Sequence, residues 1–352
     1  MPATRVLFVP VSGGAGSGEV QRCRVLAQAL QARVVREDGP AVEVHFLLAP
    51  GIDAGGFSAT ALSASPTRAP REVAASIRAL QPALVVFDGN ARVAALDAAR
   101  DAGARTLLIS SRPSARDRGW RWRRMARLDA HWLVGADLRG APGWRERLAR
   151  WRFPQVDVRR FATLFAPPGA VAPVLARLGL QAGDAYVVVC AGGGGHRATA
   201  LFGQAASALA RSGITTVAVG VEAAAPAIAV PALPNAELMA LLGGARVALL
   251  AGGSLLVQAL ALDVPVVALP LQAEQAARVR WLAAAGAVRA ATMPSTTMAA
   301  TSAQDATGVA QRVRELVDDA GARERLRTGI GALALRNGLD DAVQALAVLL
   351  QR

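Results

Sequence analysis

Residues 247–275 read VALLAGGSLLVQALALDVPVVALPLQAEQ, and this stretch decides the predicted fold. Its two apolar runs, Val247–Leu250 and Val264–Ala268, are short enough to be buried strands. The segment Leu255–Leu262 between them is predicted to be a helix, and a second helix is predicted at Ala273–Ala285. A strand, a helix and a second strand in this order form the repeating unit of a parallel α/β sheet.

The apolar part of this stretch is also long enough to be compared with a membrane span. Three features oppose that interpretation: the pair Gly252-Gly253 interrupts the run, Asp263 lies within it, and Pro265 would break a helix there. The strand-helix-strand interpretation accounts for all three.

The same alternation of strands and helices extends over most of the chain. Short apolar strands separated by helices predict parallel sheets that are covered on both faces. The further predicted strands are Val6–Val11, Val42–Leu48, Leu84–Phe87, Thr106–Ile109, Trp132–Val134, Tyr186–Cys190 and Thr215–Val219.

The alternation stops at an irregular, proline-bearing stretch around Phe165–Pro173 and then starts again. A chain of 352 residues also exceeds the usual size of one domain. We therefore predict an α/β protein with one Rossmann-like domain at 1–165 and another at 166–335. Residues 336–352 are predicted to form a C-terminal helix.

The composition favours anionic partners and a reducing compartment. The 39 basic residues exceed the 26 acidic ones, which gives a formal charge of +13. This charge suits nucleotide diphosphates, anionic lipids or nucleic acid, although a GC-rich genome also explains an excess of arginine. Cys23 and Cys190 match no metal-ligand spacing, and we expect reduced thiols, no metal site, no signal peptide and a cytoplasmic protein.

A first glycine loop, Ser12–Glu19, follows the first predicted strand and opens a helix. Glycines allow close backbone approach and a helix N-terminus attracts anions, so Gly14, Gly16 and Gly18 are candidates to contact phosphate. A full G-x-G-x-x-G motif is not completed, because Gln21 stands at its last position. A plain strand-to-helix turn without a ligand is the alternative.

Two further glycine loops follow strands of the second half. Four consecutive glycines precede His196, and the backbone amides of Gly193 and Gly194 are suited to phosphate. His196 is predicted either to contact a phosphate or sugar or to be a surface cap. The third loop, Gly252-Gly253-Ser254, opens a helix whose dipole favours a diphosphate.

Polar residues around the third loop are predicted to hold a sugar nucleotide. Gln258 lies one helical turn after Ser254 and has an amide suited to ribose hydroxyls. Gln272, Glu274 and Gln275 follow the next strand, at the sheet edge where parallel α/β sheets bind ligands.

These residues carry a resemblance to GT-B glycosyltransferases. Gly252-Gly253-Ser254, Gln258, Pro265 and the turn Pro270–Gln275 are similar to the donor site of the N-acetylglucosaminyltransferase that forms lipid II. In that family a glutamate stands where this chain has Gln258. The segment Gly16–Cys23 resembles the G-x-G-H-x-x-R-C segment of the nucleotide-sugar hydrolases of pseudaminic acid synthesis, with Glu19 in place of their histidine.

The resemblance implies a GT-B fold, with two Rossmann-like domains whose parallel sheets face across a cleft. The domain 1–165 would bind an acceptor, 166–335 the nucleotide sugar, and the C-terminal helix would pack back on the first domain. It implies a glycosyltransferase that uses an NDP-sugar as substrate, UDP-sugars being favoured, with no cofactor. The implied donor-binding residues are Gly193, Gly194, His196, Gly252, Gly253, Ser254, Gln258, Gln272, Glu274 and Gln275.

Inverting sugar transfer requires a base that deprotonates the acceptor and a positive environment for the leaving diphosphate. Glu19 is the first candidate for the base, and Asp88, at the end of a predicted strand, is the second. Either is alternatively a cap or turn residue, and Asp88-Gly89 is typical of turns. Arg22 would support a phosphate, orient Glu19, or lie on a solvated helix face. Without a D-x-D pair at a strand end, a metal-independent reaction is expected.

Residues 116–152 combine arginines with five tryptophans. Such a mixture suits an anionic membrane interface, where indoles lie at the headgroup level, and it also suits single-stranded nucleic acid. A membrane surface, at the inner face of the cytoplasmic membrane and with a lipid-linked acceptor, is the option we favour over nucleic acid. A solvated face with core tryptophans is the alternative, and Trp132 is expected in the core.

Two other functions remain open at this point. An NDP-sugar hydrolase or 2-epimerase of the same fold would hold a water with Glu19 or Asp88. A GT-B-like protein without turnover would use the basic segment to bind an anionic partner.

Overall fold

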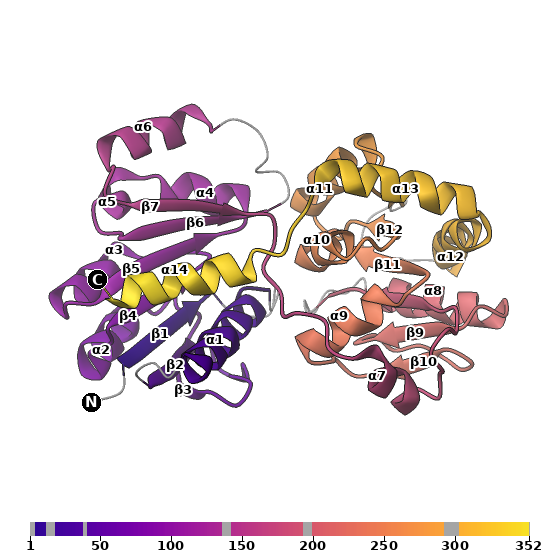
Figure 1. The fold of residues 1–352 in the computed structure, drawn as a ribbon, viewed down its shortest axis with the longest axis horizontal. Helices are drawn as coiled ribbons and strands as arrows, with labels where there is room; N and C mark the ends of the chain where they lie inside the picture. The colour runs from indigo at the N-terminus through magenta and orange to yellow at the C-terminus, as the bar shows by residue number, and fades with distance from the viewer. Residues whose placement is uncertain are drawn as a thin grey trace. The chain divides into compact units, whose positions relative to one another are not determined.

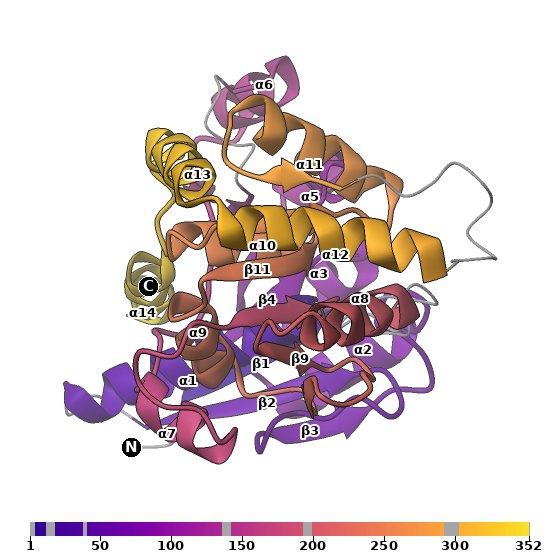
Figure 2. The ribbon, with the colours of Figure 1, turned by 90° about the vertical axis from the view of Figure 1, so that its right-hand side faces the viewer.

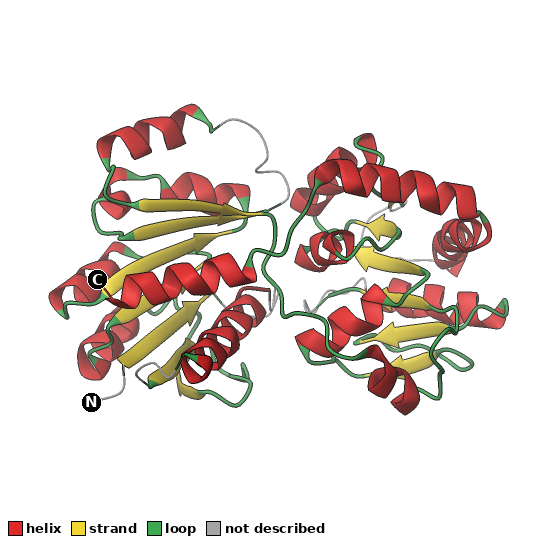
Figure 3. Ribbon diagram, in the orientation of Figure 1, coloured by secondary structure: helices red, strands yellow, loops and turns green. Residues whose placement is uncertain are grey.

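The computed structural model describes residues 4–11, 18–37, 41–135, 142–192, 199–291 and 303–351. The chain forms two compact units. The first combines Met1–Leu164 with Asn337–Arg352, and the second consists of Phe165–Arg336. Each unit contains a parallel sheet between helices (Figures 1 and 3). The predicted α/β class with two parallel sheets is confirmed.

The first unit contains a seven-stranded sheet in the order β3-β2-β1-β4-β5-β6-β7, in which all neighbouring strands are parallel. The strand order reverses between β1 and β4, so the loops after these two strands leave the same sheet edge on opposite faces. The strands are β1 (Thr4–Pro10), β2 (Val42–Leu48), β3 (Ser58–Ala61), β4 (Leu84–Asp88), β5 (Arg105–Ser110), β6 (Ala130–Val134) and β7 (Asp157–Phe161).

Side chains alternate between the two faces of this sheet. Val85 and Phe87 of β4 pack in one buried cluster with residues of α2 and α3, which contact each other. Phe8 of β1 stacks on Phe46 of β2, with ring centroids 5.2 Å apart. The helices of this unit are α1 (Gly18–Arg36), α2 (Pro70–Leu80), α3 (Val93–Asp101), α4 (Pro113–Gly119), α5 (Trp122–Met125), α6 (Trp144–Arg152) and α14 (Leu339–Gln351).

The C-terminal helix α14 belongs to the first unit and contacts α1 (Figure 1). The chain enters this helix beside β7, because Gly338 donates its backbone N–H to the carbonyl of Thr163 at 3.0 Å. A Cβ at Gly338 would lie 2.5 Å from Cδ1 of Phe161. Only glycine fits this approach without displacing the ring.

The second unit contains a six-stranded parallel sheet in the order β10-β9-β8-β11-β12-β13. Its strand order reverses between β8 and β11. The strands are β8 (Val187–Cys190), β9 (Thr216–Val219), β10 (Ile228–Val230), β11 (Val247–Ala251), β12 (Val266–Leu269) and β13 (Arg289–Ala290).

Helices cover both faces of the second sheet. One buried cluster joins the sheet to α7, α9, α10, α11 and α13, and another joins it to α8 and α12, which lie side by side (Figure 2). The helices are α7 (Val171–Arg177), α8 (Thr199–Arg211), α9 (Asn235–Gly243), α10 (Ser254–Ala261), α11 (Ala273–Ala284), α12 (Ala303–Asp318) and α13 (Ala320–Leu333).

A fully buried histidine lies inside the first unit. His131 of β6 contacts Oγ of Ser110 through Nε2 at 3.1 Å, and its ring meets Trp120 edge-on with centroids 4.4 Å apart. Burial lowers the pKa of His131 to about 3, and Arg124 contributes to this shift. The imidazole is therefore neutral in the folded protein at all but strongly acidic pH.

We expect this histidine to make the first unit sensitive to acid. A lowered pKa gives stability that is fully present above about pH 6.5 and is lost as the pH falls toward 3, because only the unfolded chain binds the proton. At about 1.4 kcal/mol per pH unit, roughly 2 kcal/mol is lost between pH 6.5 and 5. Urea unfolding at both pH values should show a smaller loss in His131→Gln than in the unmodified chain, and equal losses would contradict the argument.

Candidate functional site

The glycine loops of the second unit leave its sheet where the strand order reverses. Strands β8 and β11 are neighbours, and the loops after them therefore begin side by side at the carboxyl edge of the sheet. Ligands of open α/β sheets bind in this position. The loop after β8 is described as far as Gly192, and the predicted residues Gly193, Gly194 and His196 lie outside the described residues.

The loop after β11 leads directly into α10. Gly253 is the N-cap residue of this helix, and no side chain caps it. The first backbone N–H groups of a helix have no partner within the helix and carry its positive dipole end, so they are suited to an anion. Ser254, the first residue of α10, is exposed beside them.

Close packing against α11 holds the glycine loop in place. A Cβ at Gly252 would lie 2.8 Å from Cβ of Gln275 and 2.9 Å from Cγ2 of Val279, so only glycine fits. At Gly253 the nearest atom would be Nε2 of Gln275 at 3.9 Å, which leaves room for a side chain. Arg278 Nη1 donates to the carbonyl of Gly252 at 2.7 Å and brings a positive charge to the loop.

The other predicted donor residues occupy different places around this loop. Gln275 accepts a hydrogen bond from the backbone N–H of Leu271 at 2.7 Å, and this bond orders the turn before α11. Gln258 is partly buried one turn into α10. Gln272, the N-cap residue of α11, and Glu274 are exposed. The structure thus brings Gly252, Gly253 and Gln275 together, and sequence reasoning missed Arg278.

A buried ion pair lies at the corresponding edge of the first sheet. Arg22 of α1 donates from Nε and Nη2 to the two carboxylate oxygens of Asp88, at 2.8 and 2.6 Å. Asp88 has no exposed surface, and the Cys23 thiol lies 3.7 Å from it. Burial raises the pKa of Asp88 to about 6, while Arg22 limits the rise. Burial alone would lower the pKa of Arg22, but Asp88 raises it above its usual value.

Glu19 lies in the first turn of α1 and is also largely buried. Its Oε1 is 3.2 Å from Nη2 of Arg112, which follows β5 and is about half exposed. Gly89, with a φ of +91°, passes close to this side chain. Glu19, Arg22 and Asp88 are therefore brought to one sheet edge.

Sequence reasoning missed Arg112, although its position directly after a strand of the same sheet was the available signal. Of the predicted phosphate loop, Gly18 is the exposed first residue of α1. Gly14 and Gly16 lie outside the described residues.

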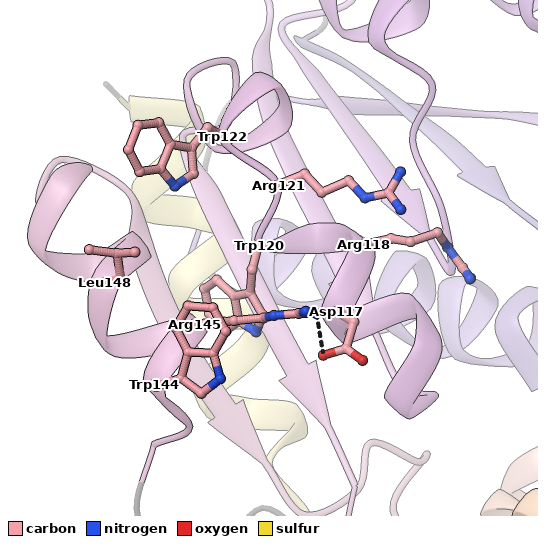
Figure 4. Close-up of a pocket in the computed structure, with 8 residues that line it drawn as sticks. All are labelled: Asp117, Arg118, Trp120, Arg121, Trp122, Trp144, Arg145 and Leu148. Carbon is pink, nitrogen blue, oxygen red and sulfur yellow. Dashed lines mark ion pairs between the residues drawn. The ribbon is translucent and has the colours of Figure 1, made fainter.

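The tryptophans of residues 116–152 divide into core and surface. Trp132 is fully buried, as predicted, and Trp120 is nearly so. Trp122, Trp144 and Trp151 are 55%, 64% and 76% exposed. These exposed indoles lie on α5 and α6, and two of them border a pocket (Figure 4).

No cluster of three or more His, Cys, Asp or Glu side chains suited to a metal ion occurs among the described residues. In the same part of the chain, no helix has the length and apolar character needed to cross a membrane.

Comparisons with known proteins identify the architecture. No protein-family model and no curated protein matches the chain. The spinosyn forosaminyltransferase SpnP is similar over 99% of this chain and 100% of its own, with a TM-score of 0.63 and 20% identity.

Two further solved structures are similar over almost their full length. UGT2 of Phytolacca americana, solved with UDP-2-fluoroglucose and pterostilbene, has a TM-score of 0.65 and 15% identity, with 99% of this chain and 100% of its own covered. MurG of Acinetobacter baumannii has a TM-score of 0.55 and 15% identity, with 99% of both chains covered. The fold predicted from the sequence is confirmed: this chain has the GT-B fold.

Proposed function

We propose that this chain is a glycosyltransferase that moves a sugar from an NDP-sugar, UDP-sugars being favoured, to an acceptor bound by the first unit. The observation that carries the proposal is the uncapped N-terminus of α10 at the strand-order reversal of the second sheet. Arg278 adds a positive charge beside it. Structures of similar fold include one with UDP-2-fluoroglucose and another, TcCGT1, with UDP.

The second unit would hold the donor. The diphosphate would accept hydrogen bonds from the first amides of α10 and from Ser254, and it would need no metal ion because the helix dipole and Arg278 offset its charge. Gln258 would contact the ribose. Gln272, Glu274 and Gln275 would contact the sugar, together with the predicted Gly193, Gly194 and His196.

In the first unit, Glu19 would be the general base of an inverting reaction. Both oxygens of Asp88 accept from Arg22, and this carboxylate has no exposed surface, so it has no free position toward an acceptor. We assign Asp88 a positioning role instead: it fixes Arg22 on α1, three residues after Glu19. Within the part of the chain that the structure describes, Glu19 has one ion pair, from Oε1 to the more exposed Arg112, and we assign the proton transfer to its other oxygen.

Thermal-shift measurements with UDP-, GDP-, dTDP- and CDP-sugars test the donor assignment. We expect one class to raise the melting temperature, because a ligand that binds only the folded chain stabilises it. No shift with any of the four at millimolar concentration would contradict the proposal. Chromatography of the products then separates transfer from hydrolysis, since a hydrolase releases free sugar without an acceptor.

We further propose that the first unit binds the anionic inner face of the cytoplasmic membrane, where a lipid-linked acceptor would be available. On α6, Trp144, Leu148 and Trp151 are exposed at spacings of four and three residues, which places them on one helix face. Arginines flank this face. Such a helix is suited to lie in a headgroup region, where each basic residue contributes about 1 kcal/mol.

Co-sedimentation with vesicles tests the membrane proposal. We expect binding to vesicles that contain phosphatidylglycerol, loss of binding in high salt, and weaker binding of the double variant Trp151→Ala/Arg123→Gln. Vesicles of phosphatidylcholine alone are the matched control. Absence of binding at low salt would defeat the proposal and leave a water-soluble acceptor.

A further inference from the structure

A pocket of about 410 Å³ lies in the first unit among α4, α5 and α6. Its volume falls in the range of about 300–1,000 Å³ that small-molecule sites occupy. One side of it is apolar and aromatic, while the guanidinium groups of Arg118 and Arg121 extend away from that side (Figure 4). The lining residues are Asp117, Arg118, Trp120, Arg121, Trp122, Trp144, Arg145 and Leu148.

The basic side of the pocket carries charge that the protein does not neutralise. Within the described ranges, Arg118 and Arg121 make no side-chain hydrogen bond or ion pair. Arg145 makes a long contact of 3.9 Å with the exposed Asp117 and lies over the Trp144 ring, 5.3 Å from its centroid. Exposed arginines without partners are common, so these residues alone do not indicate a ligand.

Arg124 makes the stronger case. This residue of α5 is only 7% exposed, and its side chain has no acidic or hydrogen-bonding partner in the described part of the chain. Burial, together with the nearby Arg121, Arg118 and Arg92, lowers its pKa to about 10. A charge that is shielded from much of the solvent and has no acidic partner is unfavourable, and here three like charges add to the cost. An anion bound among them would relieve it.

We propose that this pocket binds an amphipathic anion, with an apolar group against Trp120, Trp122 and Trp144 and a phosphate or carboxylate at Arg118 and Arg121. Arg124 does not line the pocket, but its charge lies close enough to both arginines to attract the same anion. Charge complementarity selects this occupant. A neutral apolar ligand would leave the guanidinium groups unpaired, and a simple inorganic anion would leave the indoles exposed to water.

Helix α4 connects the pocket with the ion-pair partner of the candidate base. Helix α4 begins at Pro113, directly after Arg112, the ion-pair partner of Glu19. At a rise of 1.5 Å per residue, Arg118 lies about 8 Å along the helix from this start. The occupant would accordingly be the acceptor. That assignment rests on the proposed function, whereas the binding itself does not depend on it.

Isothermal titration calorimetry of the full chain with decyl phosphate, below its micellar concentration and without vesicles or nucleotide, tests the proposal. We expect one ligand per chain, and at least about tenfold weaker binding of inorganic phosphate and of decanol, because each lacks half of the recognised groups. Equal binding of decanol and decyl phosphate would overturn the proposal. If the chain binds vesicles but does not bind dissolved decyl phosphate, the pocket proposal would be overturned as well.

Two pairs of single-residue variants test whether decyl phosphate binds in this pocket. Arg121→Gln and Trp144→Ala change residues that line the pocket, and each should weaken decyl phosphate binding at least about tenfold. Arg123→Gln and Trp151→Ala remove an exposed arginine and an exposed indole nearby that do not line it, and they should bind normally. Equal affinities across the two pairs would refute the location. All four positions are exposed, so the fold should be retained, which circular dichroism checks.

The test of the pocket and the test of the proposed glycosyltransferase function can give independent results. Decyl phosphate binding in a chain that responds to no NDP-sugar would support the pocket and contradict the glycosyltransferase assignment. A response to an NDP-sugar in a chain that does not bind decyl phosphate would refute the pocket and leave the donor site unaffected.

Discussion

Gly253→Asp should abolish nucleotide-sugar binding while the second unit stays folded. Gly253 has a φ of −81°, which any residue adopts, and a Cβ there meets no atom closer than 3.9 Å. Aspartate is also a favourable N-cap residue, so α10 should be at least as stable as before. Its carboxylate would accept from the amides that we assign to the diphosphate and would repel the phosphates. We expect affinity at least about 100-fold weaker by calorimetry.

Two control variants show whether the effect of Gly253→Asp comes from the negative charge, from the shape of the side chain, or from disturbed packing of the loop. Gly253→Asn has nearly the same shape and caps the same amides without the negative charge, so it should weaken binding less than aspartate does. Gly252→Ala should instead destabilise the unit, because its methyl group would collide with Gln275 and Val279. Unchanged nucleotide affinity in folded Gly253→Asp would show that the donor does not bind at α10.

Central strands were predictable because burial on both faces makes them continuous apolar runs. Strands β1, β4, β8 and β11 have this character, and the structure contains all four within one or two residues of the expected bounds. The strand β3 was not predicted. Its sequence is SATA, and all four residues are exposed, because it is an edge strand that contributes no apolar side chain to the core.

The strand at the other edge of the first sheet was not predicted from the sequence either. Strand β7 reads DVRRF, and only its last residue is buried. Backbone pairing with β6 determines this strand, and its side chains carry no alternating pattern that would predict it.

Site positions were easier to predict than site contacts. The ends of neighbouring parallel strands must share a sheet edge, and this rule placed Glu19, Asp88 and the loop Gly252-Gly253-Ser254 correctly relative to the sheets. It does not say which polar groups pair. Asp88 lies on the same face of β4 as Val86, two residues earlier, and this face of the sheet contacts α1. Arg22 of α1 is within hydrogen-bond distance of the Asp88 carboxylate. That pairing depends on the position of α1 over the sheet, which residue patterns do not contain.

Glu19→Gln should lower the turnover number by about 100-fold or more, the usual contribution of a positioned general base, with little change in donor affinity. The amide oxygen of glutamine can still accept from Arg112, which lies 3.2 Å from the carboxylate, so the side chain should keep its position. Only the ability to take a proton is lost. Released nucleoside diphosphate at saturating donor measures the turnover.

Asp88→Asn distinguishes the base from the residue that positions it. This change leaves Arg22 buried without its counter-charge, and such a loss typically destabilises a protein by about 3–5 kcal/mol. Its effect on turnover should therefore come with a lower melting temperature, whereas Glu19→Gln should slow turnover at nearly unchanged stability. If Glu19→Gln turns over normally and Asp88→Asn is slow but fully stable, the two roles are reversed. That result would require the Arg22–Asp88 pair to open during the reaction, since the carboxylate has no exposed surface in the structure.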